Sequence, residues 1–460
     1  MTMDLKKYQS LFKNYTELRV QKTESKHLCF VKGENTVSEK TISSGVSARS
    51  YKNGFWGFAS HSELDESSLK TVIRQANDNA AFLSSKTVQK SKSFPATVNH
   101  HSVNTFCTTK PRKSFNEIMA FVQEIDQYIF RKYSKLLTRG LTLSCLDMEK
   151  TLLTSDETLA YSMVPRTLLC VFLDIEKDQE PIELYEVFGG LGQFEDYFSD
   201  PKLLYPKIDQ LYEDLMLKKE GVYAKAGIKE CILDSEVSGI LAHEAIGHTT
   251  EADFVLGGSI AKDYLDQQVA SPLISLIDFA HTFQGQTCPI PVYIDDEGTK
   301  AQDTIIIDQG VLQGFMHNKE TALKFNVPPT GHARAFKFSD EPLIRMRNTA
   351  ILPGDNSIKE MIASIEDGYY FKKPGGGQAD STSEFMFAIE QGFEIKNGKL
   401  GRALKNTTIS GLAFEVLKSV SMVSDDFQWS VSGMCGKKQL IPVSDGGPAL
   451  KCRVNVGGRA

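Results

Sequence analysis

Hydrophobic and polar residues recur at two different spacings in the first part of the chain. Helical spacing predicts helices over about 4–18 and 67–83. Alternating spacing predicts short strands between them, and the Asn53-Gly54 pair is typical of a tight hairpin turn. The expected strands span residues 28–31, 45–51 and 55–59. Together these elements predict a small N-terminal α+β domain over residues 1–95.

A second group of elements follows over residues 105–220. Ser114 and Glu117 form a capping-box pattern, which predicts a helix that begins directly after Ser114. Beyond it we expect two strands and a further helix, over residues 141–154, 166–177 and 206–217. The apolar run from Leu168 to Leu173 indicates a strand that is buried on both faces. This range is predicted to be a middle α/β domain.

The remaining residues, 225–460, combine one strong helix pattern with many short strand patterns. The helix begins near Asp234. Strands are expected over residues 290–294, 305–308, 311–317, 384–395, 407–409 and 449–456. The C-terminal domain is therefore predicted to be a mostly antiparallel β-sheet domain with a central helix, and the whole chain to belong to the α+β class.

Composition narrows the classes of function. Lys and Arg number 52 and Asp and Glu number 58, so the net charge is −6 and direct binding to nucleic acid is not expected. The most apolar stretch, residues 168–173, is too short to span a membrane, and no secretory signal pattern opens the sequence. The eight cysteines are scattered without a Cys-x-x-Cys pair. These features predict a cytoplasmic protein with reduced thiols and no membrane contact.

The helix near Asp234 carries the residues that point most clearly to chemistry. Two of the nine histidines, His243 and His248, enclose the segment that begins with Glu244. Neutral imidazoles bind metal ions, and a carboxylate directly beside one of them can accept a proton from water that the metal activates. We therefore predict that His243 and His248 bind one divalent metal ion and that Glu244 is the catalytic base.

The spacing of the two histidines requires a distorted helix. They stand at positions i and i+5, which lie about 140° apart on an ideal helix at roughly 100° per residue. A π-type bulge brings such positions together and favours functional sites, and Gly247 makes the distortion easier. The alternative is an ordinary helix end with a Gly-His exit. That interpretation leaves His243 and Glu244 without a role.

Two histidines need a third protein ligand if one position of the metal is to stay open for water. Cys435 is the leading candidate because glycines stand on both sides of it at close range, in Gly433-Met434-Cys435-Gly436. Cys452 is the competitor. Around Cys452 apolar and polar residues alternate, as in a strand with one buried face, and Cys452 stands at an apolar position. This pattern favours a place for Cys452 in the hydrophobic core.

Two further residues are candidates for a supporting role. Glu251 lies shortly after His248 and could orient an imidazole from behind, although a solvated carboxylate in a loop is an equally good interpretation. His332, in the sequence Gly331-His332-Ala333-Arg334, would suit a substrate-binding loop. A lone histidine of this kind is more often structural.

These residues resemble the TldD/PmbA family of metallopeptidases. The similar segments are His243 to His248 with Glu251-Ala252-Asp253-Phe254, Gly45-Val46 to Gly57-Phe58-Ala59, Met346-Arg347-Asn348-Thr349 with Leu352-Pro353-Gly354, and Gly433-Met434-Cys435-Gly436-Lys437. They follow the family's order and span most of the chain. The stretch 336–341 departs from the family pattern, so the substrate preference can differ.

The resemblance implies a cytosolic metallopeptidase of the catalytic type, with His243, His248 and Cys435 as metal ligands and Glu244 as the base. A cysteine and two histidines favour zinc, and iron is also compatible. The family also implies a homodimer, or a heterodimer with another family member, that encloses the site and selects unstructured peptides. The alternative function is a regulatory, protein-binding subunit with a residual or structural metal site. Glu244 argues against it, since a structural site has no use for a base.

Overall fold

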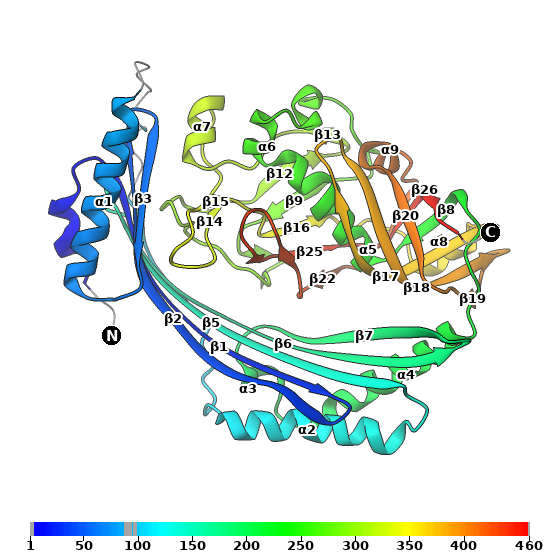
Figure 1. Ribbon diagram of the computed structural model, residues 1–460. Helices are drawn as coiled ribbons and strands as arrows, with labels where there is room; N and C mark the ends of the chain where they lie inside the picture. Colours follow the sequence, from blue (N-terminus) through cyan, green and yellow to red (C-terminus); the bar gives the residue numbers. More distant parts are fainter. Residues whose placement is uncertain (1–3, 87–93, 95–98, 459–460) are drawn as a thin grey trace.

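The computed structural model describes residues 4–86, 94 and 99–458. Figure 1 shows a long curved sheet, formed by the first half of the chain, and a second body that lies on the concave side of this sheet. The helices α1, α2 and α4 lie on the other, convex side. The fold is of the mixed α+β class, as predicted. Within the described ranges, no helix has the length and apolar character needed to cross a membrane.

Two antiparallel groups of strands form the curved sheet. The first contains β1 (Tyr15–Val31), β2 (Glu34–Lys52) and β3 (Phe55–His61), and the second contains β5 (Thr138–Thr154), β6 (Leu159–Lys177) and β7 (Glu180–Leu191). β1 pairs with β5 from Glu17 to Val31, and β4 (His101–Thr105) adds parallel to the first part of β6. One sheet therefore runs through both ranges that were predicted as N-terminal and middle domains. The predicted end of the first domain, residue 95, lies outside the described residues.

The start of the chain differs from its predicted helix. Lys6–Leu11 forms a short 3₁₀-helix (η1), and β1 begins at Tyr15. Because β1 pairs on both sides, with β2 and with β5, its backbone hydrogen bonds outweigh the local helical spacing. The predicted hairpin turn is confirmed: Asn53 and Gly54 have φ of 50° and 94°, as a tight turn between twisted strands requires.

The helices of the first half cover one face of the sheet. They are α1 (Glu66–Ser85), α2 (Phe115–Lys132), α3 (Phe194–Tyr197), η2 (Pro201–Leu204) and α4 (Tyr205–Lys219). The capping box of Ser114 and Glu117 is confirmed at the start of α2. The expectation of a strand buried on both faces was wrong, because helices cover only one face there: Leu169 and Val171 are fully buried while Leu168 is only partly buried.

The described part of the second half contains two large sheets and three two-stranded ones. In the first, β8 (Gly227–Leu233), β17 (Asp367–Ala379), β18 (Glu384–Lys396), β20 (Thr407–Leu412) and β26 (Leu450–Val456) pair in a closed ring, with β19 (Lys399–Ala403) attached to β18. The second consists of β9 (Leu276–Phe279), β12 (Thr304–Asp308), β13 (Val311–Leu312), β16 (Asn348–Ile351), β22 (Gln428–Ser430) and β25 (Ser444–Gly447). Most of the pairings are antiparallel, as predicted for this domain.

The remaining elements are short. They are η5 (Ile260–Tyr264), α6 (Ala252–Leu256), α7 (Lys319–Phe325), α8 (Ile358–Ala363), α9 (Ala413–Lys418), β10 (Thr282–Phe283), β11 (Gln286–Thr287), β14 (Ala333–Arg334), β15 (Leu343–Ile344), β21 (Met422–Val423), β23 (Met434–Cys435) and β24 (Ile441–Pro442). The strand predicted at 290–294 is absent. The Asn348 side chain bonds both the N–H and the C=O of Ile290, at 2.8 Å each, and so takes the place of a neighbouring strand.

The predicted central helix is present and lies between the two sheets. It consists of α5 (Ser235–Ile240), the π-helix η3 (Leu241–Gly247) and a 3₁₀ turn η4 (His248–Thr250). α5 contacts β25 of the second sheet and β17 of the ring, and η3 contacts β16 and β17. Residues on this helix are therefore held by both sheets, which gives their side chains little freedom.

Candidate metal centre

The π-helix solves the spacing problem of the two histidines. Asp234 caps α5 by accepting the N–H of Ser235. In η3 the N–H of His248 bonds the carbonyl of His243, five residues earlier, so both side chains leave the same face. Gly247 also allows a close approach, since a Cβ at this position would lie 2.0 Å from Met346 Sδ. The predicted bulge is confirmed.

Cys435 joins the two histidines from the other end of the chain. The short hairpin of β23 and β24 brings its thiol to 3.3 Å from His248 Nε2. The ring centroids of His243 and His248 are 5.2 Å apart. One potential ligand atom from each of the three residues lies within 4.8 Å of the others, and among the described residues this is the one such group of three or more. The structure thus places the three predicted ligands together.

Hydrogen bonds within this group change the acidity of its members. Burial opposes ionisation of the Cys435 thiol, but hydrogen bonds from His243 and His248 lower its pKa to about 4. The same contacts overcome burial and raise the pKa of His248 to about 10. Cys452 is the opposite case, because burial in the core raises its pKa to about 12. Cys435 therefore has the thiolate character that a metal ligand needs, and Cys452 does not.

The donor set fits a bound metal ion. His243 is only 4% exposed, and its Nδ1 has no hydrogen-bond partner in the described part of the chain. A buried polar atom without a partner costs free energy, and a metal ion among these side chains would give the ring one. Two imidazole nitrogens and a thiolate are a zinc-type set that leaves a position open for water or substrate.

Two carboxylates flank the second histidine. Glu244 Oε2 lies 3.8 Å from His248 Nε2, and its side chain is 26% exposed, so it can reach solvent or a bound molecule. Glu251 is fully buried, and its Oε2 lies 3.0 Å from His248 Nδ1. Lys437 Nζ lies 3.2 Å from the same carboxylate oxygen. Glu251 is therefore placed to fix the orientation of the His248 ring, with Lys437 behind it.

His332 lies away from this group. Its ring is fully buried, with Nε2 at 3.0 Å from Asp278 Oδ1 and Nδ1 at 2.8 Å from the Thr330 hydroxyl. Asp278 also accepts from Arg347 Nε at 2.7 Å. A buried ring with both nitrogens engaged offers nothing to a substrate. His332 thus holds a structural ion network, which corrects its interpretation as a substrate-contact residue.

A cleft of about 720 Å³ opens in front of His243 and Glu244. One wall comes from β7 and the η2–α4 segment of the first half, and the other from α5, β17 and β22 of the second half. Among the lining groups are Glu236 of α5 and Asp445 of β25. Burial, together with the nearby carboxylates of Glu236 and Glu244, raises the pKa of Asp445 to about 7.

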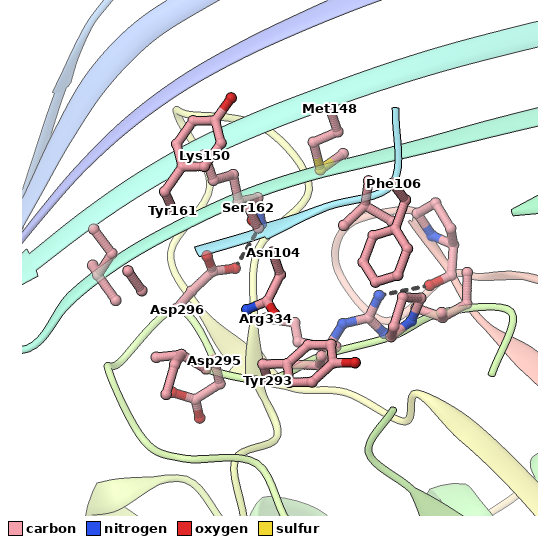
Figure 2. Close-up of a pocket in the computed structure, with 18 of the residues that line it drawn as sticks. Asn104, Phe106, Met148, Lys150, Tyr161, Ser162, Tyr293, Asp295, Asp296 and Arg334 are labelled. Atoms are coloured by element: carbon pink, nitrogen blue, oxygen red, sulfur yellow. Dashed lines mark hydrogen bonds and ion pairs between the residues drawn. The ribbon is translucent and has the colours of Figure 1, made fainter. Parts of the chain in front are cut away.

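A second, smaller cavity of about 110 Å³ lies between the curved sheet and residues 289–296 (Figure 2). Its charged groups already have partners: Lys150 Nζ lies 2.8 Å from Asp296 Oδ2, and Arg334 donates to the Pro442 carbonyl at 2.8 Å. His243, His248 and Cys435 are not among the residues that line it. The cavity therefore belongs to the interface between the two halves and not to the candidate centre.

Four residues around the centre were missed in the sequence. Arg345 is fully buried and donates to the Cys435 carbonyl at 2.6 Å, which holds the ligand-bearing hairpin in place. Lys437 was named only as part of a family segment, and Glu236 and Asp445 not at all. Such residues follow no local pattern, because their neighbours come from distant parts of the chain. The alternation of Arg345, Met346 and Arg347 is the one signal that could have drawn attention to a buried ionic segment between two strands.

Comparison with known proteins agrees with this geometry. The family model of the PmbA/TldA metallopeptidase C-terminal domain matches residues 227–458, and that of PmbA/TldA metallopeptidase domain 1 matches residues 16–80. A zinc metalloprotease TldD homolog of Saccharolobus solfataricus is 29% identical over 99% of both chains. A metalloprotease TldD homolog of Haemophilus influenzae is 32% identical over 69% of this chain and 67% of its own.

Solved structures show the same fold. The crystal structure of TldE from Thermococcus kodakarensis superimposes with a TM-score of 0.77, at 15% identity and 99% coverage of both chains. The likeness at this identity concerns the fold alone. One family model matches half of the chain, and one relative has an identity above 30%. This chain therefore belongs to the PmbA/TldA (TldD) metallopeptidase family.

Proposed function

We propose that this protein is a metal-dependent peptidase that hydrolyses unstructured peptides. The observation that supports this most is the position of Glu244. It is a partly exposed carboxylate on the wall of a large cleft, directly beside two imidazoles and a thiolate. A regulatory protein with a structural metal site would not need a reactive group in a cleft. The membership of the metallopeptidase family points in the same direction.

In the proposed mechanism, His243, His248 and Cys435 hold one divalent metal ion, and their chemistry favours zinc over iron. When bound, the metal supplies Lewis acidity toward water and the peptide carbonyl. Glu244 accepts the proton of the attacking water and returns it to the leaving amine. Glu251 accepts the His248 Nδ1–H and keeps the opposite ring nitrogen aimed at the centre.

We also propose that the peptide binds in an extended form, as an added strand. β22 is the edge strand of the second sheet, and its residues Gln428 to Ser430 line the cleft. An open edge offers backbone hydrogen bonds to any extended chain, without demanding a particular side-chain sequence. A homodimer, or a heterodimer with a family member, would close the cleft against folded proteins. The proposed substrates are therefore flexible peptides of varied sequence.

The test combines metal content with cleavage. The purified protein is assayed against several unrelated flexible peptides and one stably folded protein, before and after chelation and after zinc is returned. We expect cleavage of the peptides alone, its loss with chelator and its recovery with zinc. Copies of one peptide with N-methylated backbone positions test whether the peptide binds as an added strand. Methylation at some of these positions should block cleavage. Metal-loaded protein that cuts no peptide would support the regulatory alternative.

A further inference from the structure

Two carboxylates in the cleft form no close ion pair with the residues that the structure describes, although Lys373 lies near enough to favour the charge of Glu236, and His243 that of Asp445. Asp445 is only 8% exposed, yet its side chain accepts no hydrogen bond and forms no ion pair with any other residue that the structure describes. Glu236 is partly buried and is likewise without a hydrogen bond or an ion pair in the described ranges. Both line the cleft, and each lies close enough to affect the other's charge.

Two other carboxylates, one in the cleft and one in the interface, have a lysine at close range. Glu186, on the opposite wall of the cleft, is paired with Lys373 at 2.8 Å. The carboxylate of Asp296, in the interface shown in Figure 2, is paired with Lys150. Burying a carboxylate without an ion pair makes its ionised form costly, and a bound cation would remove that cost, so we regard these two carboxylates as open for a cation.

The cation is not a second metal ion. Glu236 and Asp445 do not converge with a third carboxylate, histidine or cysteine into a metal-binding group; the one such group among the described residues is that of His243, His248 and Cys435. The space next to the carboxylates is also wide, and Tyr185 and Trp429 contribute aromatic surface to it. Aromatic walls suit the alkyl stem and the charged head of an organic cation.

We propose that Glu236 and Asp445 form a subsite for an organic cation of the substrate, the ammonium or guanidinium group of the bound peptide. This inference rests on the proposed peptidase function and adds a substrate class to it. The cation has two possible sources: a Lys or Arg side chain near the scissile bond, or a free α-amino group. In either case the peptide supplies the ion-pair partner that Glu236 and Asp445 lack, and cationic peptides bind in preference to neutral ones.

The first test uses cleavage by the zinc-loaded protein. Matched peptides carry Lys, norleucine or Glu at each position near the scissile bond, with a free or an acetylated N-terminus. We expect kcat/KM to be about 10- to 100-fold higher for the peptide with the cation than for its neutral counterpart, because the neutral peptide leaves the buried carboxylates unpaired. In E236Q and D445N this ratio should fall toward one. The control, E415Q, removes an exposed carboxylate of α9 and should leave the ratio unchanged.

The arms of the experiment identify the source of the cation. Dependence on Lys at one position assigns a basic side chain, whereas dependence on the free N-terminus assigns the α-amino group. Equal cleavage of cationic and neutral peptides would overturn the subsite and leave the peptidase proposal intact. A D445N protein that loses zinc, with the Lys preference intact in E236Q, would also overturn it, because Asp445 would then support His243 instead.

A binding measurement separates the two proposals if no peptide is cut. Titration calorimetry compares the Lys and norleucine peptides with zinc-loaded E244Q, and then with E244Q/D445N and E244Q/E236Q. Stronger binding of the Lys peptide that is lost in both double variants would support the subsite even without cleavage. Equal binding of the two peptides to E244Q would reject it. Zinc content and circular dichroism establish that each variant is loaded and folded.

Discussion

The two halves of the molecule use β-strands for different purposes. The curved sheet has strands of 17 to 19 residues, such as β1, β2 and β6, paired along almost their whole length. In the second half, β8 and β26 have 7 residues each and belong to a closed ring with a hydrophobic interior. The long sheet provides a surface of stable shape, whereas the ring and its neighbouring sheet hold single side chains at fixed positions.

The chemistry follows the same division. His243, Glu244, His248 and Cys435 all come from the second half, and the curved sheet contributes only a wall of the cleft. The two halves meet through buried charges: Arg49 of β2 lies 2.9 Å from Glu17 and also pairs with Glu297 of the second half. Such contacts are specific in geometry, so the wall is held at a defined place relative to the reactive groups.

The largest effect is expected from the ligand cysteine. C435A should lose the bound metal and with it all cleavage, because the thiolate donor is gone. C452A removes an equally buried thiol from the ring and should keep the metal, at a cost in stability only. Elemental analysis of both proteins decides the matter. Loss of metal in C452A alone would mean that the third ligand was assigned to the wrong thiol.

E244Q should lower the rate of cleavage without changing metal binding or the stability of the second half. The amide keeps the shape of the side chain but cannot accept a proton from water, so kcat should fall by about 10²- to 10⁴-fold. Metal content and the unfolding midpoint should stay at the wild-type level. E415Q, with the same change on the surface, serves as the control. Near-normal turnover of E244Q would remove this residue from the mechanism.

D278N should weaken the second half while leaving the first half intact. Asp278 accepts hydrogen bonds from His332 and Arg347, and loss of one partner in such a buried network costs about 3–5 kcal/mol of unfolding free energy. The chain has two tryptophans, Trp56 in β3 and Trp429 in β22, so the single-tryptophan backgrounds W429F and W56F let fluorescence follow each half separately. The Trp429 transition should move to lower urea in D278N. The control is D308N, which changes an exposed residue and should alter the unfolding free energy by about 0.5 kcal/mol or less.

The same variant carries a pH dependence. Burial opposes ionisation of Asp278, but Arg347 and His332 outweigh it and hold its pKa well below the usual range. A depressed pKa in the folded state stabilises the protein above the unfolded-state pKa of about 3.9 and loses this effect as the pH falls further. The stability difference between wild type and D278N should therefore be full at neutral pH and shrink below about pH 4. A difference that grows on acidification would contradict this.

The smallest effect is expected in the first half. S114A removes the cap of α2, whose hydroxyl accepts the Glu117 N–H, and should cost about 1 kcal/mol. The Trp56 transition should shift slightly, and cleavage should not change. S67A, at an exposed position of α1, is the control and should change stability by less than about 0.5 kcal/mol. A loss of cleavage in S114A would show that the first half affects the reactive groups as well as the shape of the cleft.

The fold was predictable where local signals decide structure. The capping box of Ser114, the Asn53-Gly54 turn and the spacing in α1 and α2 are properties of neighbouring residues, and the elements formed there as expected. The start of β1 was not predictable in this way. Its hydrogen bonds run to residues up to Thr154, far along the chain, and no local pattern contains that information.

The candidate site divides along the same line. His243, Glu244 and His248 form a local motif, and the distortion that unites the histidines followed from their spacing and from Gly247. Cys435 was recognisable by its glycine neighbours. In contrast, Arg345 and Asp445 gain their significance only from groups that the fold brings beside them. Their roles depend on the convergence of distant segments and therefore required the structure.

The distance along the chain between His248 and Cys435 has a consequence for biosynthesis. The two residues are separated by 187 positions, and β26, which completes the ring, comes later in the chain than Cys435. A ribosome therefore has to add 187 residues after His248 before the last of the three donor atoms is present. Until then, a growing chain carries the helix with Glu244 but not the full ligand set. The proposed peptidase activity is therefore expected only after Cys435 and β26 have joined this helix.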